Sequence, residues 1–253
     1  MVLHYRSLGQ GKPLVILHGL FGSGDNWHSF AKSISGQYQT IMMDIRNHGL
    51  SSHTPDFNYE LICEDIADTL RSMDITSCYL MGHSMGGKAA AYFTLKYPEW
   101  VEKLIVLDIA LKEYPPHHQR YFDAMLSMDL VAITNRMEAD QWLQQYIDDT
   151  MVRQFILKNL VRTDEGQFRW RFHLASLYQH YHEINISIKT NHPFTKPVLF
   201  IKGEKSNYIL SDDMTGIKNC FPLAILETVP GAGHWVHADK PNELKALVLQ
   251  FLN

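Results

Sequence analysis

Cysteine is scarce in this chain of 253 residues. The three cysteines, Cys63, Cys78 and Cys220, are far apart, odd in number and form no C-x-x-C pair. This spacing argues against a disulfide framework and suggests no zinc or other metal site. The sequence therefore predicts packed structural thiols in a reducing compartment, which we expect to be the cytoplasm.

Strong charge and long apolar runs are also lacking. There are 23 lysines and arginines against 27 aspartates and glutamates, a formal net charge of -4, so the charge balance favours neither nucleic acid nor an anionic membrane as a partner. No stretch approaches the ~18 consecutive apolar residues of a membrane span. The N-terminal segment lacks the basic start and apolar run of a secretion signal. We expect a monomer or weak homo-oligomer whose partner is a small molecule.

What the sequence does contain is a series of short apolar runs, each ending at a glycine or an aspartate. Such runs suit parallel strands that are covered on both faces. The runs are Leu14–Leu17, Thr40–Met43, Cys78–Met81 and Leu104–Leu107. Val2–Leu8 alternates and predicts a strand at the sheet edge, while Leu61–Met73 and Met85–Tyr97 have helical periodicity. This alternation predicts an α/β fold with a mostly parallel central sheet flanked by helices.

The alternation stops at the pair Pro115 and Pro116. From there to about residue 192 the pattern is helical and rich in aromatics, and strand patterns return at Val198–Ile201 and Ala224–Val229 before a last helix at Glu243–Leu252. Ligands of open α/β sheets bind at the carboxyl ends of the strands, so we expect the helical segment to cover that edge as a cap. The predicted segments are an α/β core over 1–111, an all-helical cap over 112–192 and the rest of the core over 193–253.

The segment Gly82–Gly86 (GHSMG) lies where a predicted strand passes into a helix. In this G-x-S-x-G spacing the serine occupies a tight, strained turn, and the flanking glycines let strand and helix approach closely. The helix that follows points its first N–H groups and its positive dipole end at the site. The pattern predicts Ser84 as a nucleophile.

Acyl-transfer chemistry also needs two N–H donors aimed at the developing oxyanion. One is expected from Met85, the residue after the nucleophile, and the other from the loop that follows the strand Leu14–Leu17. In that loop Leu20 is the first choice and Phe21 the second. We expect His18 to brace the loop by hydrogen bonding rather than to act in catalysis.

Among the 14 histidines, His234 is the best placed for a catalytic base. It follows the last predicted strand in the segment Pro230–Trp235 (PGAGHW), where two glycines free the loop to bring an imidazole to the sheet edge. We expect His237 to be solvated or bracing. His83 adjoins the nucleophile, but its side chain is expected to point away from that of Ser84.

Two positions can supply the carboxylate that orients the base. One is the loop after Val198–Ile201, which contains Glu204 but has Ser206 where many proteins with this fold have aspartate. The other is Asp108, at the end of the run Leu104–Leu107, where burial between apolar neighbours is costly without strong partners. We assign the acid to Asp108 and keep Glu204 as the alternative.

Together these motifs resemble the α/β-hydrolase superfamily, and within it most closely the bacterial YbfF-type esterases. The resembling segments are His18–Ser23 (HGLFGS), Asp44–Ser51 (DIRNHGLS), Gly82–Ala89 (GHSMGGKA), Leu107–Ala110 (LDIA) and Gly231–Pro241 (GAGHWVHADKP). The resemblance implies a triad of Ser84, Asp108 and His234. It also implies a helical cap inserted after the sixth-strand position, no cofactor, and esterase or acyl-thioester hydrolase activity.

The resemblance also directs attention to aromatic residues. The stretch Gln167–Phe172 (QFRWRF) resembles an aromatic and basic segment of that family's cap, and Trp235 follows the expected base. We treat Phe21, Trp170 and Trp235 as candidate substrate-binding residues. For the two tryptophans, packing within the cap is the alternative.

The sequence therefore predicts a serine esterase or thioesterase that hydrolyses carboxylic acyl esters, with acyl-CoA thioesters as a second substrate class. The expected reaction passes through an acyl-enzyme on Ser84. Two other classes stay open: a lyase or perhydrolase that uses the same triad, and a ligand-binding protein on a hydrolase scaffold. Haloalkane dehalogenase and epoxide hydrolase chemistry is disfavoured because it needs aspartate at position 84.

Overall fold

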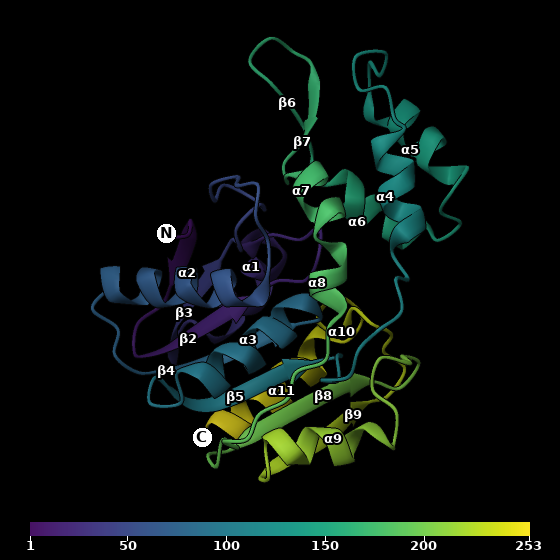
Figure 1. The fold of residues 1–253 in the computed structure, drawn as a ribbon. Coiled ribbons are helices and arrows are strands. Elements are labelled where there is room, and N and C mark those ends of the chain that lie inside the picture. The colour runs from purple at the N-terminus through teal and green to yellow at the C-terminus, as the bar shows by residue number, and fades with distance from the viewer.

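The computed structural model describes all residues from 1 to 253. Its centre is a seven-stranded sheet with the strand order β1-β3-β2-β4-β5-β8-β9 (Figure 1). The edge strand β1 runs antiparallel to β3, and every other neighbouring pair is parallel, which confirms the predicted fold class. The strands are β1 (Tyr5–Leu8), β2 (Lys12–Leu17), β3 (Tyr38–Met43), β4 (Cys78–His83), β5 (Val101–Leu107), β8 (Val198–Gly203) and β9 (Ala224–Val229).

Helices cover both faces of this sheet. The helices α2, α3 and α9 pack against one face, and α1, α10 and α11 pack against the other (Figure 1). None of the helices combines the length and the hydropathy needed to cross a lipid bilayer. The helices of the core are η1 (Gly24–Trp27), α1 (His28–Ile34), α2 (Tyr59–Ser72), α3 (Met85–Lys96), α9 (Asp213–Cys220), α10 (Val236–Asp239) and α11 (Pro241–Leu252).

Alternation along the strands explains why both faces are covered. On β2, Val15 and Leu17 belong to the hydrophobic cluster under α2 and α3. Leu14 and Ile16 belong to the cluster under α1 and α11. Successive side chains of a strand point to opposite faces, so a run that is apolar at every position must be buried on both. All four of these side chains are inaccessible to solvent.

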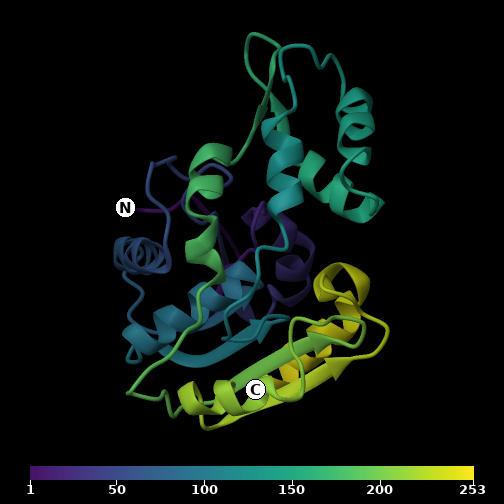
Figure 2. The same ribbon diagram turned by 45° about the vertical axis from the view of Figure 1, so that its right-hand side comes forward.

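Between β5 and β8 the chain leaves the sheet and forms a separate layer, which we call the cap (residues 112–192). Figure 1 and Figure 2 show it projecting above the sheet. Its buried apolar residues belong to the same cluster as those under α2 and α3, so the cap and the core share one hydrophobic interior. The elements of the cap are α4 (Gln119–Leu126), α5 (Arg136–Gln144), α6 (Thr150–Leu157), β6 (Leu160–Arg162), β7 (Phe168–Trp170), α7 (Leu174–Gln179) and α8 (Tyr181–Asn185).

The prediction of an all-helical cap was wrong at one place, where β6 and β7 pair as an antiparallel hairpin. Gly166 lies between the two strands with a φ of 83°, a left-handed conformation that glycine adopts without strain. Phe168 and Trp170 are buried and Arg169 between them is exposed, the period of two that is typical of a strand. Strands of three residues are too short to stand out in a segment with helical periodicity on both sides.

Candidate active site

Ser84 occupies the turn between β4 and α3. Its backbone has a φ of 54° and a ψ of -122°, a conformation that a non-glycine residue adopts only under constraint. A Cβ atom on Gly82 would overlap the Gly86 carbonyl oxygen, and one on Gly86 would overlap the His18 carbonyl oxygen. The two glycines thus let α3 approach β4 and β2 closely, and the serine is presented at the carboxyl end of β4.

Asp108 directly follows β5 and also has a left-handed φ, of 48°. Its carboxylate is inaccessible to solvent. Oδ1 accepts a hydrogen bond from the Gly203 N–H at 3.0 Å. Oδ2 accepts hydrogen bonds from His234 Nδ1 at 2.7 Å and from the Ser206 hydroxyl. These donors offset the cost of burying a carboxylate, and His234 is the partner that the sequence led us to expect.

Ser206 was not predicted to take part in the site. It lies in the loop after β8, and its hydroxyl donates to the carboxylate of Asp108 on the neighbouring strand. Ser206 therefore does not supply the carboxylate of the site. It donates a hydrogen bond to the carboxylate that follows β5, that of Asp108. Glu204, the alternative acid, is exposed and accepts the Gly231 N–H at 2.8 Å, so it braces the loop of His234 and not its ring.

His234 lies in the loop after β9, and its ring and backbone are held from three sides. Nδ1 donates to Asp108, and the ring stacks on Tyr208 with centroids 4.1 Å apart. His83 Nε2 donates to the His234 carbonyl oxygen at 2.8 Å, and burial holds the pKa of His83 well below its usual value, so that this donor is neutral. Because Nδ1 is bonded to the carboxylate, Nε2 is the ring nitrogen of His234 that is left to take up a proton. Ser84 and His234 line the same cavity.

The loop after β2 brings backbone N–H groups to the serine. A Cβ atom on Gly19 would lie 3.3 Å from the Ser84 Cβ atom, so this loop and the nucleophile turn are in contact. The Phe21 N–H already donates to a histidine ring at 3.3 Å. No hydrogen bond among the loops, turns and helix ends uses the N–H of Leu20 or of Met85. Those two donors are free for an acceptor in the cavity, which favours Leu20 over Phe21 as the second oxyanion donor.

Two buried histidines hold this loop in place. His18 Nδ1 donates to the Gly19 carbonyl oxygen at 2.8 Å, and its Nε2 accepts the Ile45 N–H at 3.0 Å, which confirms its predicted bracing role. His48 donates from Nδ1 to a backbone carbonyl and accepts the Phe21 N–H at Nε2. Burial lowers the pKa of His48 to about 3, and the nearby His18 adds to the shift, so its ring remains a neutral acceptor.

An apolar cavity of about 190 Å³ lies over the serine. Its lining consists of Gly19, Leu20, Phe21, His83, Ser84, His118, Tyr121, Val152, Phe155, Ile156, Tyr208, His234 and Trp235. Phe21 and Trp235 therefore lie where substrate contact was predicted, whereas Trp170 does not. Trp170 stacks on Phe172 with centroids 5.5 Å apart, because β7 turns its side chain into the packing of the cap.

His118, a cap residue at the start of α4, was not predicted to face the site. Its backbone N–H donates to the Tyr181 hydroxyl at 2.8 Å, and the same hydroxyl is hydrogen-bonded to His118 Nδ1, also at 2.8 Å. The other ring nitrogen, Nε2, lies 3.5 Å from the Tyr208 hydroxyl. Burial lowers the pKa of His118 to about 3 and keeps the ring neutral. No motif marked this residue, because its place in the site depends on how the cap packs.

The polar groups around the cavity are thus a serine, histidines, tyrosines and backbone N–H groups. No group of three or more histidine, cysteine, aspartate or glutamate side chains is arranged to hold a metal ion.

Known proteins identify the family of the chain. The family model described as alpha/beta hydrolase fold matches residues 12–241. The chain belongs to this family. The α/β-hydrolase is 38% identical over 253 residues to the sn-1-specific diacylglycerol lipase ABHD11 of Danio rerio, a match that covers 96% of this chain and 79% of that protein. It is 34% identical over 242 residues to esterase YbfF of Escherichia coli (strain K12), with 95% of this chain and 93% of that protein covered.

Solved structures agree with this family. A structure named Marine microorganism esterase matches the α/β-hydrolase with a TM-score of 0.96 and 41% sequence identity, and the match covers 99% of both chains. The predicted fold and the predicted relation to YbfF-type esterases are confirmed. All three relatives are named as esterases or lipases, so the prediction of a carboxylic ester hydrolase is confirmed at the level of the enzyme class.

Proposed function

We propose that this α/β-hydrolase is a serine esterase that cleaves carboxylic acyl esters through an acyl-enzyme on Ser84. The observation that carries the proposal is the 2.7 Å contact between His234 Nδ1 and Asp108 Oδ2, beside the cavity that His234 and Ser84 line together. A nucleophile, a base and a carboxylate that orients the base are the groups that this type of acyl transfer requires.

Each group has one task in the proposed reaction. His234 takes the Ser84 proton on Nε2 as the hydroxyl attacks the ester carbonyl, while Asp108 orients the ring and stabilises the imidazolium. The N–H groups of Leu20 and Met85 stabilise the oxyanion of the tetrahedral intermediate. His234 then gives its proton to the leaving alcohol. Water, deprotonated by the same ring, attacks the acyl-enzyme and releases the acid.

The lining of the cavity favours an apolar acyl group. Leucine, valine, isoleucine, phenylalanine and tryptophan side chains surround most of the space over the serine. An apolar chain placed there leaves no polar group of the substrate without a partner. Thioesters present the same carbonyl carbon to the nucleophile, so acyl thioesters, including those of coenzyme A, form the second substrate class of the proposal.

We place this activity in a reducing compartment, the cytoplasm. Cys63, Cys78 and Cys220 are free and buried. Burial raises the pKa of Cys78 to about 12, which keeps this thiol protonated and unreactive. Free thiols that persist without pairing suit a reducing environment. The expected partner is the small-molecule substrate, and the expected state is a monomer or weak homo-oligomer.

Labelling with a fluorophosphonate probe tests the nucleophile. The wild-type chain should take up the probe stoichiometrically and Ser84→Ala should take up none, because the probe reacts with an activated serine hydroxyl. Ser33→Ala is the matched control, since it removes an exposed hydroxyl of α1 and should label like the wild type.

A panel of esters with one leaving group and graded acyl chains, run beside the matching acyl-CoA thioesters, tests the reaction. Ester hydrolysis that disappears in Ser84→Ala supports the proposal. Stoichiometric labelling without hydrolysis of any ester or thioester would instead indicate a lyase or perhydrolase. Folded protein that takes up no label would indicate a ligand-binding protein.

A further inference from the structure

Lys88 is a buried lysine whose hydrogen bonds all go to backbone carbonyl groups. It lies on α3, one helical turn after Ser84, and is only 1% exposed. Its Nζ donates to the carbonyl oxygens of Lys112 at 2.8 Å, Asn185 at 3.2 Å and Ile186 at 2.6 Å. An ammonium group has three N–H donors and no acceptor, so these three carbonyls use its full capacity.

The three carbonyls belong to two stretches at the base of the cap, one where the chain enters the cap and one where it turns back toward the core. We call these stretches, residues 110–114 and 184–188, the stalk. Lys112 lies on the way into the cap, and Asn185 and Ile186 lie on the way out. Lys88 is therefore bonded to both stretches of the stalk at once.

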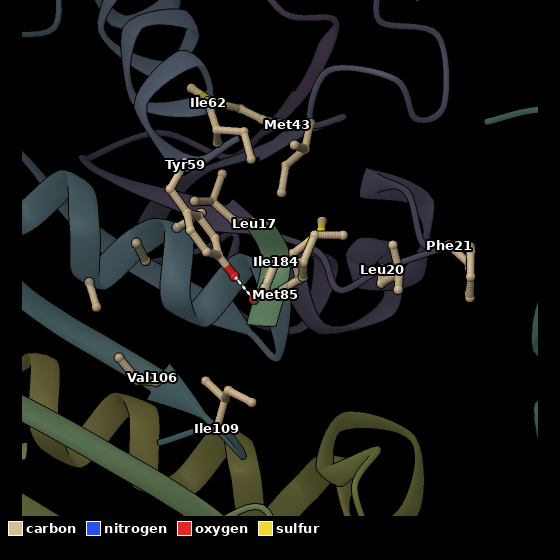
Figure 3. Close-up of a cluster of buried hydrophobic side chains, with 14 of the residues drawn as sticks. Leu17, Leu20, Phe21, Met43, Tyr59, Ile62, Met85, Val106, Ile109 and Ile184 are labelled. Atoms are coloured by element: carbon tan, nitrogen blue, oxygen red, sulfur yellow. Dashed lines mark hydrogen bonds between the residues drawn. The ribbon is translucent and has the colours of Figure 1, made fainter. Parts of the chain in front are cut away.

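Further hydrogen bonds join the stalk to itself and to the core. The Tyr114 N–H donates to the Asn185 carbonyl oxygen at 3.0 Å, and the N–H of residue 188 donates to the carbonyl oxygen of residue 111 at 2.8 Å. Figure 3 shows the hydroxyl of Tyr59, on α2, pointing at the carbonyl of Ile184, to which it donates at 2.8 Å. The stalk is thus a paired segment with defined points of attachment, of which Lys88 provides three.

A lysine buried in this way is costly. Burial lowers the pKa of Lys88 to about 7, and the Glu113 carboxylate opposes the shift. An apolar side chain of similar length would avoid that desolvation, but it would leave the carbonyls of Lys112 and Ile186 without this donor, while that of Asn185 keeps the Tyr114 N–H. A buried ionic group is weak evidence for added stability, and the bonds of Lys88 suggest instead that it holds one arrangement of the chain.

That arrangement holds the base of the cap on the helix that follows the serine. Val152, Phe155 and Ile156 of α6 line the cavity above Ser84. The stalk is one attachment of this part of the cap to the core, and another is the Asn159 side chain, which donates to the Phe21 carbonyl oxygen at 2.7 Å. Because Lys88 lies on the helix that begins after Ser84, its bonds attach the cap and the nucleophile to the same rigid element.

We infer that Lys88 is a positioning residue, which clasps both stretches of the stalk to α3 and so fixes the cap over the acyl cavity. It acts on the reaction through the separation between α6 and Ser84, without touching substrate. The inference rests on the proposed function for its kinetic readout. Long acyl chains, which reach the cap, should depend on Lys88, whereas an acetyl group, which stays near the serine, should depend on it little.

Lys88→Met keeps the aliphatic stem and removes the three donors. With one leaving group throughout, kcat/KM for a decanoyl ester should fall about tenfold relative to kcat/KM for an acetyl ester, mainly through KM. Lys88→Arg keeps N–H donors and should recover most of this ratio. Lys103→Met is the matched control, because Lys103 also donates to two backbone carbonyls, those of residues 251 and 252, but outside the cap. It should leave the ratio unchanged.

Hydrogen exchange supplies a readout that does not need catalysis. The amides of Tyr114 and Ile188 should exchange faster in Lys88→Met than in the wild type, while those of β4 should not change. A folded Lys88→Met with wild-type ester ratio and wild-type stalk exchange would overturn the inference, as would the same change of ratio in Lys103→Met.

If Lys88→Met does not fold, Lys88→Gln, which keeps two N–H donors, takes its place. It should shift the ester ratio and the stalk exchange in the same direction by a smaller amount. If neither readout shifted in folded Lys88→Gln, the inference would be overturned. If Ser84→Ala retained hydrolysis, the proposed function would fail, but stalk exchange would still decide the role of Lys88.

Discussion

The core and the cap of this α/β-hydrolase hold their functional residues in different ways. In the core, Ser84 and Asp108 each follow a parallel strand with a left-handed φ, and glycines or neighbouring strands enforce that backbone. In the cap, Val152, Phe155 and Ile156 face the cavity from an ordinary helix, α6. The groups proposed to do the chemistry are thus placed by the local backbone, whereas the groups that meet the acyl chain are placed by packing between layers.

This difference predicts how substitutions in the two regions affect the reaction. Changes to the core groups proposed to act on the reacting carbonyl should lower kcat for every ester by the same factor, because all substrates share that carbonyl. Changes in the cap should alter KM and depend on acyl length, because only long chains reach it.

The largest effect should come from Asp108→Asn in the core. Loss of the carboxylate removes the group that orients the His234 ring, and kcat should fall about 10⁴-fold for all acyl lengths, measured by steady-state hydrolysis. Glu204→Gln removes a charge from the neighbouring loop and should change kcat by less than about threefold, the range expected for a surface substitution away from the reacting groups. A large loss in Glu204→Gln with little change in Asp108→Asn would show that the acid had been assigned to the wrong residue.

Neutral histidines in both regions, one buried and one half-buried, predict acid sensitivity. The pKa is lowered to about 3 for His48 in the core and for His118 in the cap, mainly by burial. In the unfolded chain these rings take up protons below about pH 6.5. The unfolded state therefore binds more protons between pH 6.5 and 3. Stability is fully present above pH 6.5 and falls below it by about 1.4 kcal/mol per pH unit for each histidine.

His48→Gln and His118→Gln test whether the two regions unfold together. Urea unfolding between pH 7 and 4.5 should show a pH slope that is smaller by about 1.4 kcal/mol per unit in each variant. If only His48→Gln changed the slope of the main transition, the cap would be unfolding separately from the core, and the shared hydrophobic interior would not make them one cooperative unit.

Ser206→Ala should lower kcat moderately and to the same extent for all acyl lengths. It removes one donor to Asp108 Oδ2, and kcat should fall about tenfold at every acyl length, the cost of a lost hydrogen bond to a charged group. Ser211→Ala, an exposed serine of the same loop region, serves as control. An effect confined to long acyl chains would contradict a role through Asp108.

The smallest effects are expected from substitutions of two tryptophans, one that lines the cavity and one that does not. Trp235→Ala should raise KM for long acyl esters about fivefold and leave acetyl esters unaffected, because Trp235 lines the cavity. Trp170→Phe should change no kinetic constant, because Trp170 lies outside the cavity and its indole N–H is buried without a partner. Acyl selectivity that responded to Trp170→Phe would show that the cap rearranges around bound substrate.

The strands of the core followed from the sequence, because apolar runs such as Leu14–Leu17 leave few alternatives to a strand covered on both faces. The strained turn at Ser84 also followed from the sequence, since glycine spacing reports a backbone requirement that acts over a few residues, while the roles of Ser84 and Leu20 stay predictions. The hairpin β6–β7 was missed because its strands are only three residues long.

What the sequence determined by itself was the local geometry. It showed where strands end, where a tight turn presents a serine, and which glycine-containing loop can bring a histidine to the edge of the sheet. Only the tertiary structure decided that Ser206 would bond Asp108 across 98 positions, that His118 would face the cavity, and that Lys88 would join both stretches of the stalk. Such contacts join residues from separate layers. Their existence depends on how those layers pack, for which no short run of residues carries a signal.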